Sequence, residues 1–158
     1  MQHSVYLSLG SNIRPHENIP KALKVISEKL TLLQVSSAWI TKAVGTNGPD
    51  FVNLAVHILT ELDQVELKEE ILIRIEDDLG RIRTADKNAP RPIDLDIILF
   101  DDQVIDSNLW KLDYLILPFS ELIPHFSPSP AGKPLIEQAT EIRSRSSATK
   151  LAQFPNSN

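Results

Sequence analysis

Cysteine is absent from the 158 residues of the chain. Its absence excludes disulfide bonds and thiolate metal sites, and it suits a reducing compartment. The chain also lacks a run of about 20 apolar residues, the length that crosses a membrane. Its first residues lack the basic and apolar regions of a secretory signal. We therefore expect a cytoplasmic protein without a membrane partner.

An excess of positive charge is likewise missing. Lys and Arg number 16 against 21 Asp and Glu, which gives a net charge of −5 and a pI of about 5.3. This balance argues against a nucleic-acid partner, so an anionic ligand needs a local basic cluster. With 42% hydrophobic residues, we expect one domain over residues 1–158, and a monomer with a dimer as the alternative. From about residue 143 we expect a polar tail, a weak helix with a frayed end.

Hydrophobic periodicity predicts the order strand, helix, strand, strand, helix, strand. This order is that of an α+β, ferredoxin-like αβ sandwich, with a mostly antiparallel sheet and flanking helices, which we expect on one face of the sheet. The expected strands cover residues 5–9, 32–41, 51–59 and 92–100, a hairpin turn at 101–102 leads into 103–105, and a further short strand is expected at 112–117.

Two helices are expected between these strands. The first runs from about residue 19 to 30, and Pro20 fits it only in the first turn. The second begins at a capping box formed by Asp63 and Glu66 and ends at Gly80.

Two aspartates stand at the start of the apolar strand at 92–100. On an extended chain, residues i and i+2 share a face about 7 Å apart, so Asp94 and Asp96 lie together while Leu95 takes the other face. Two carboxylates this close favour a bound cation. Hard oxygen ligands suit Mg²⁺ or Mn²⁺, and Mg²⁺ completes its shell with water and substrate phosphate.

A basic segment precedes the aspartates in a chain of negative net charge. It contains Arg81, Arg83, Lys87 and Arg91. Arginine pairs with phosphate oxygens through two N–H groups, and a metal between the aspartates would bridge phosphate oxygens from the opposite side, as in phosphoryl or pyrophosphoryl transfer. The alternative is that the arginines and aspartates pair with one another across a loop.

Other catalytic patterns are missing from the sequence. No glycine-rich phosphate loop, zinc spacing or serine triad is present. The amide of Asn53 could read the edge of a heterocycle that stacks on Phe51. The alternative for this pair is an ordinary strand-end Asn beside a core Phe.

Four segments together resemble a known family. They read L-G-S-N at 9–12, P-D-F-V-N-L-A-V at 49–56, G-R-I-R at 80–83 and P-R-P-I-D-L-D-I at 90–97. In this order and spacing they are similar to 6-hydroxymethyl-7,8-dihydropterin pyrophosphokinase of folate biosynthesis, over most of residues 4–124. The resemblance implies a ferredoxin-like fold, ATP with two Mg²⁺ ions, and transfer of pyrophosphate to the hydroxymethyl group of the pterin with release of AMP.

The resemblance also assigns site residues. It implies that both Mg²⁺ ions are held by Asp94 and Asp96, and that Asn12 organises the first loop. The implied pterin site comprises Thr41, Val44, Phe51, Asn53 and Tyr114. The implied ATP site comprises Glu76, Arg81, Arg83 and Arg91, and the residues implied in catalysis are Arg81, Arg91, Asp94 and Asp96.

One segment departs from the family pattern. Residues 105–114 are several residues shorter than usual and lack the histidine and the arginine that the family supplies to the phosphates. Lys111 is the candidate to replace that charge in the ATP site, as a point cation. Our first hypothesis is an active pyrophosphokinase. The alternative is a divergent paralogue that binds pterin with weak or no transfer, and a third class, a structural or nucleic-acid-binding domain, fits the fold but not the net charge.

Overall fold

The computed structural model describes residues 1–43 and 48–152. Its centre is one antiparallel sheet in the order β6-β5-β1-β4-β3-β7, and β2 also pairs with β4. The strands are β1 (His3–Ser11), β2 (Thr31–Val35), β3 (Trp39–Thr41), β4 (Phe51–Thr60), β5 (Asp94–Phe100), β6 (Gln103–Val104) and β7 (Thr149–Lys150). The helical segments are α1 (Pro15–Lys29), α2 (Gln64–Glu66), η1 (Leu67–Leu72), α3 (Ile73–Asp78), η2 (Ser107–Trp110), α4 (Asp113–Leu122) and α5 (Leu135–Arg143).

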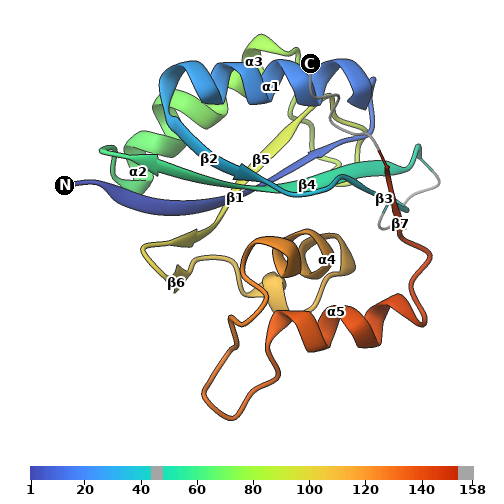
Figure 1. The fold of residues 1–158 in the computed structure, drawn as a ribbon. Helices are drawn as coiled ribbons and strands as arrows, with labels where there is room; N and C mark the ends of the chain where they lie inside the picture. The colour runs from blue at the N-terminus through green and yellow to red at the C-terminus, as the bar shows by residue number, and fades with distance from the viewer. Residues whose placement is uncertain (44–47, 153–158) are drawn as a thin grey trace.

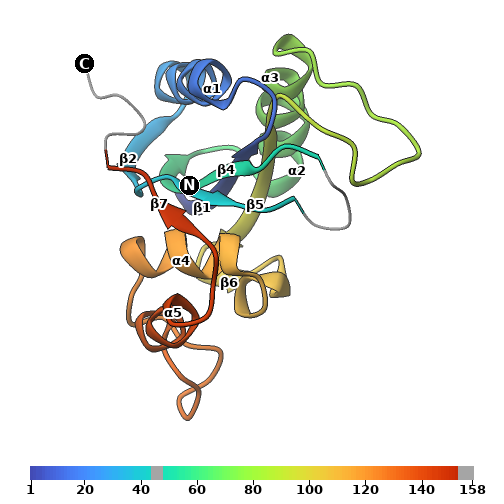
Figure 2. The same cartoon turned by 90° about the vertical axis from the view of Figure 1, so that its right-hand side faces the viewer.

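Helices cover both faces of the sheet. The helix α1 and the continuous segment α2–η1–α3 lie on one face, and α4 and α5 lie on the other (Figure 1). Figure 2 shows the same three layers from the side. The antiparallel sheet with helices confirms the α+β class, but the expectation of helices on one face was wrong. Among the described residues, no helix has the length and apolar character needed to cross a membrane.

Side chains of β4 point alternately to the two faces of the sheet, so the strand contributes to two hydrophobic cores. Val52, Leu54 and Ile58 are buried in the core beneath α1 and α3. Ala55 points the other way and joins the core that α4 and α5 form with Trp39. Strands β1 and β4, at the centre of the sheet, are therefore buried on both faces for most of their length.

The strand expected at 112–117 was wrong, because this segment is the start of α4. Leu115, Ile116 and Phe119 are all almost completely buried. A short, continuous apolar run has no period by which a strand can be told from a buried helix. The helix expected after residue 143 was also wrong: α5 ends there, and β7 follows. Residues 153–158 of the expected frayed end lie outside the described residues.

Other boundaries differ more modestly from the prediction. The strand expected at 32–41 is divided into β2 and β3, which pair with successive parts of β4. The first helix already begins at Pro15, so Pro20 lies inside α1 and not in its first turn. The capping box of Asp63 and Glu66 is confirmed by both of its hydrogen bonds, each 2.9 Å long. The hairpin is confirmed as well, with positive φ at Asp101 and Asp102, as in a two-residue type I′ turn.

Candidate active site

Two small residues of β1 create the floor of the candidate site. Ser8 pairs with Asp96 of β5, while Gly10 pairs with Asp94 on one side and with Asn53 of β4 on the other. The pairing therefore sets the two aspartates and the asparagine on neighbouring strands, across a strip of small side chains.

A pocket of about 160 Å³ opens above this floor. It unites four of the residues predicted for the pterin with the two aspartates. Its lining residues are Ser8, Gly10, Thr41, Lys42, Phe51, Asn53, Lys87, Asn88, Arg91, Asp94, Asp96 and Tyr114. Val44, the fifth predicted pterin residue, lies outside the described residues.

The carboxamide of Asn53 is held in one orientation. Its Nδ2 donates to Oγ1 of Thr41 at 2.8 Å, and the residue is 5% exposed. A Cβ atom at Gly10 would lie 2.7 Å from Oδ1 of Asn53, closer than any normal contact. The absence of a side chain at Gly10 thus makes room for an amide that is fixed beside Phe51. A fixed amide next to an aromatic ring suits a flat heterocycle with donors and acceptors on its edge.

The end of α3 delivers Arg81 to the site. Gly80 adopts a left-handed φ of 91°, and its N–H donates to the carbonyl of Asp77 at 3.0 Å. The N–H of Arg81 donates to the carbonyl of Glu76, also at 3.0 Å. These two bonds form a Schellman motif, which reverses the chain at the helix end. As a result, Arg81 lies beside Glu76, the last buried residue of the helix.

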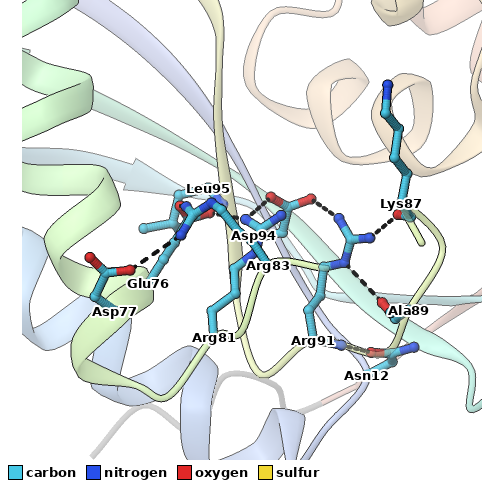
Figure 3. Close-up of polar contacts among 10 residues, drawn as sticks. All are labelled: Asn12, Glu76, Asp77, Arg81, Arg83, Lys87, Ala89, Arg91, Asp94 and Leu95. Carbon is cyan, nitrogen blue, oxygen red and sulfur yellow. Dashed lines mark hydrogen bonds and ion pairs between the residues drawn. The ribbon is translucent and has the colours of Figure 1, made fainter. Parts of the chain in front are cut away.

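Glu76 is the buried centre of an ion-pair network (Figure 3). It is only 3% exposed, and its carboxylate accepts from Nη1 of Arg81, from Nη2 of Arg83 at 2.5 Å and from the N–H of Leu95 at 3.0 Å. Burial raises the pKa of Glu76, and the bond from Leu95 and the two arginines oppose that rise. Glu76 therefore positions both arginines and the start of β5, and its predicted contact with ATP stays a prediction.

Asp94 is held by two guanidinium groups. Nη1 of Arg81 donates to Oδ1 of Asp94 at 2.7 Å, and Nη1 of Arg91 donates to Oδ2 at 3.2 Å (Figure 3). The alternative interpretation of the basic segment, ion pairs between its arginines and the aspartates, is therefore observed at Asp94. Arg91 lines the pocket, and Arg81 lines an adjoining cavity of about 380 Å³ that shares Arg91, Asp94 and Asp96 with it.

Asp96 has a different environment. Its carboxylate reaches solvent and makes no hydrogen bond or ion pair with another described residue. Desolvation by the surrounding protein, followed by the charges of Asp94 and Glu76, nevertheless raises the pKa of Asp96 to about 7. A bound cation would relieve this crowding of carboxylates.

Asn12 connects three loops through its hydrogen bonds. Its Oδ1 accepts from the N–H of Arg91 at 2.7 Å, and its own N–H donates to the carbonyl of Arg91 at 3.1 Å. Its Nδ2 donates to the carbonyl of Pro49 at 3.3 Å. Asn12 is 4% exposed. The backbone of Arg91 and the end of the loop before β4 are therefore tied to the first loop.

The remaining predicted ATP residues are less central. Arg83 is 46% exposed and pairs with Asp77 as well as with Glu76. Lys111 follows η2 and is exposed, and it is not among the described residues that line the pocket. Its predicted contact with phosphate stays a prediction.

Several lining residues were not predicted from the sequence. Lys42 and Asn88 bring further polar groups to the rim, beside Lys87 of the predicted basic segment. Ser8 and Gly10 form the floor. In the sequence, Ser8 and Gly10 alternate with the bulky Leu7 and Leu9, which places two small residues on one strand face but does not tell which strands lie beside them.

The two aspartates suit a hard divalent cation better than zinc. No group of three or more His, Cys, Asp or Glu side chains that could hold a metal occurs in residues 1–43 and 48–152. Mg²⁺ is commonly bound by one or two carboxylates, with water and substrate phosphate as its other ligands. The donor set of Asp94 and Asp96 fits that pattern.

Comparison with known proteins identifies the family. The model of the 7,8-dihydro-6-hydroxymethylpterin-pyrophosphokinase (HPPK) family matches residues 6–124, three quarters of the chain. The chain belongs to the HPPK family. A 2-amino-4-hydroxy-6-hydroxymethyldihydropteridine pyrophosphokinase of Aquifex aeolicus is 33% identical over 147 residues, which cover 85% of this chain and 89% of the relative. The Bacillus subtilis protein of the same name is 36% identical, over 75% of this chain and 69% of the relative.

Solved structures agree with the HPPK fold. A crystal structure of Plasmodium falciparum HPPK-DHPS superposes with a TM-score of 0.71 at 12% identity, over 92% of this chain and 44% of that longer chain. At this identity the likeness concerns the fold alone. It confirms the predicted fold class, a ferredoxin-like α+β sandwich.

Proposed function

We propose that the chain transfers the β,γ-pyrophosphoryl group of ATP to the hydroxymethyl oxygen of 6-hydroxymethyl-7,8-dihydropterin and releases AMP, as a step of folate biosynthesis. One observation carries the proposal: a single pocket joins the fixed amide of Asn53 to the carboxylates of Asp94 and Asp96. Membership of the HPPK family supports the same activity.

The pterin would occupy the aromatic side of the pocket. Phe51 from β4 and Tyr114 from the first turn of α4 would flank the ring, and the amide of Asn53, oriented by Thr41, would bind its edge. With its ring held by these groups, the pterin would direct its hydroxymethyl group towards Asp94 and Asp96. The proximity of acceptor and phosphate accounts for much of the rate in such a transfer.

Two Mg²⁺ ions would be held by Asp94 and Asp96, and when bound they would neutralise the charge of the phosphates. In the transfer, the pterin oxygen forms a bond to the β-phosphorus as the bond from that phosphorus to the oxygen shared with the α-phosphate breaks. The hydroxyl proton leaves to solvent, and AMP keeps the shared oxygen. Arg81 and Arg91 would bind the phosphate oxygens, with Arg83 and Lys111 as outer charges.

The test is AMP release from ATP in the presence of Mg²⁺ and 6-hydroxymethyl-7,8-dihydropterin. We expect Asp94→Asn and Asp96→Asn to lower kcat at least about 100-fold, since each variant loses a negative charge that would hold the Mg²⁺ ions at the phosphates. Asp102→Asn is the matched control: it makes the same change at the tip of the β5–β6 hairpin, where Asn also tolerates a positive φ. Equal AMP release by all four proteins would refute the assignment.

A pterin-binding protein without transfer activity is the second candidate. It is favoured by the short segment at 105–114, which lacks a histidine and an arginine. Calorimetry separates the two functions. Tighter pterin binding in the presence of an ATP analogue and Mg²⁺ supports the enzyme, whereas pterin binding that is indifferent to both supports the binding protein.

A further inference from the structure

Both carboxylate oxygens of Asp94 accept hydrogen bonds from arginine side chains. Oδ1 accepts from Arg81 at 2.7 Å and Oδ2 from Arg91 at 3.2 Å. Asp94 and both arginine side chains are partly buried, with 26%, 16% and 18% of their side chains exposed. Each carboxylate oxygen can accept two contacts, so a metal ion at Asp94 would bind oxygens that two guanidinium groups already neutralise, next to their positive charges.

We propose that Arg81 and Arg91 reserve the metal site for a cation that arrives together with a polyphosphate, and exclude the free divalent cation. The two guanidinium groups act as counter-ions of Asp94 in the free protein. When metal and nucleotide bind together, the guanidinium groups would pair with phosphate oxygens and the carboxylate of Asp94 would bind the metal. The inference rests on the proposed metal and ATP site and adds to it a selection between ligands.

The local charges support this exchange. Glu76, Asp77 and Asp94 carry three negative charges when ionised, and the arginines that form ion pairs with them, Arg81, Arg83 and Arg91, carry three positive charges. The paired groups are thus balanced, 3 − 3 = 0. A dication alone would add two positive charges next to the guanidinium groups of Arg81 and Arg91. A metal with its polyphosphate brings the anion that those groups need.

Each of the two arginines has a contact that does not depend on Asp94. Arg81 keeps its bond to the buried Glu76. The backbone of Arg91 is tied by two bonds to Asn12, whereas its guanidinium also donates to the carbonyls of Lys87 and Ala89 in the neighbouring loop. The exchange at Asp94 therefore also changes what holds the loop before β5.

Binding of Mn²⁺ alone, followed by electron paramagnetic resonance, tests the proposal. We expect Arg91→Ala to bind Mn²⁺ at least about 5-fold more tightly than the wild type, because a charge-assisted contact no longer competes for Asp94. Arg91→Gln, which keeps the length of the side chain, should show the same direction if the alanine variant folds poorly. Arg83→Ala is the matched control, since it removes the same charge from the cluster but no contact of Asp94.

Equilibrium dialysis with a non-hydrolysable ATP analogue completes the test. The analogue should increase the Mn²⁺ affinity of the wild type by a larger factor than that of Arg91→Ala. Equal affinities of wild type and both Arg91 variants for Mn²⁺ alone, or an equal gain in Arg83→Ala, would overturn the proposal while the metal site stands. Absence of Mn²⁺ from every protein, with and without the analogue, would overturn the metal site and the proposal together.

Discussion

At the scale of the residue, Gly10 decides whether the amide of Asn53 can stay where it lies. We expect Gly10→Ala to lower pterin affinity at least about 10-fold, because the new Cβ would meet Oδ1 of Asn53 at 2.7 Å and push the amide away from Thr41. Its cost in stability should be modest, about 1–3 kcal/mol, as for other overpacked sites. Calorimetric titration of the pterin in the presence of an ATP analogue measures the affinity.

A double-mutant cycle is the control for this prediction. In an Asn53→Ala background the clash is absent, so Gly10→Ala should cost little further affinity. Additive losses would show that Gly10 acts through something other than Asn53.

Glu76 is a second residue on which we expect the stability of the site to depend. Glu76→Gln should lower the free energy of unfolding by about 1–3 kcal/mol, because the uncharged amide leaves two guanidinium groups and the N–H of Leu95 with a weaker partner. Urea denaturation at pH 7 measures this. Asp77→Asn, which breaks only an exposed pair with Arg83, should change it by less than about 0.5 kcal/mol. Similar losses in both variants would contradict a special role for the buried carboxylate.

The sequence allowed Asp94 and Asp96 to be found because an i, i+2 pair shares a strand face in any sheet. It did not allow Ser8 and Gly10 to be found as the pocket floor, since their role depends on the register of β1 against β4 and β5. Register is a non-local property that one strand cannot encode. From the sequence, ion pairs between Arg91 and Asp94 are one of two alternatives, because spacing alone does not tell a protein partner from a phosphate.

At the scale of the element, local chemistry predicted the start and the end of the second helix but not the type of α4. The capping box at Asp63 and the stop at Gly80 follow from backbone geometry within a few residues, so they were predictable. The helix α4 was not, because its apolar residues are buried on all sides and show no period. The helical layer on the second face consists of α4 and of α5, which the sequence did not predict either.

Helix α4, which carries Tyr114, packs against β3, which carries Thr41 of the pocket. Glu121 of α4 connects this helix to β3 and to the residues before it. Its Oε2 accepts from Nε1 of Trp39 at 2.8 Å and its Oε1 from the N–H of Ser37 at 3.1 Å. Glu121→Ala should therefore cost about 1–2 kcal/mol of stability and shift the fluorescence of Trp39. Glu121→Gln, which keeps one oxygen acceptor, should lose less. An unchanged emission spectrum in Glu121→Ala would exclude this contact.

At the scale of the whole molecule, a cluster of Ser4, Tyr6 and His57 at the far end of β1 makes the free energy of unfolding depend on pH. His57 of β4 lies half-buried, with Nε2 2.7 Å from Oγ of Ser4 and its ring stacked on Tyr6 at 4.1 Å. Burial lowers the pKa of His57 below its ordinary value of 6.5, although Asp102 opposes the shift. The folded protein therefore favours the neutral imidazole.

The sign of the effect on stability follows from this shift. Below about pH 6.5 the unfolded chain takes up a proton at His57 more readily than the folded protein does, so this histidine reduces stability as the pH falls. The slope from one such proton cannot exceed about 1.4 kcal/mol per pH unit. We expect His57→Gln to lose less stability than the wild type between pH 7.5 and pH 5, as measured by urea denaturation. Asp102→Asn should steepen the wild-type slope, because it removes the charge that supports the protonated ring, whereas parallel profiles for all three proteins would contradict a role for His57.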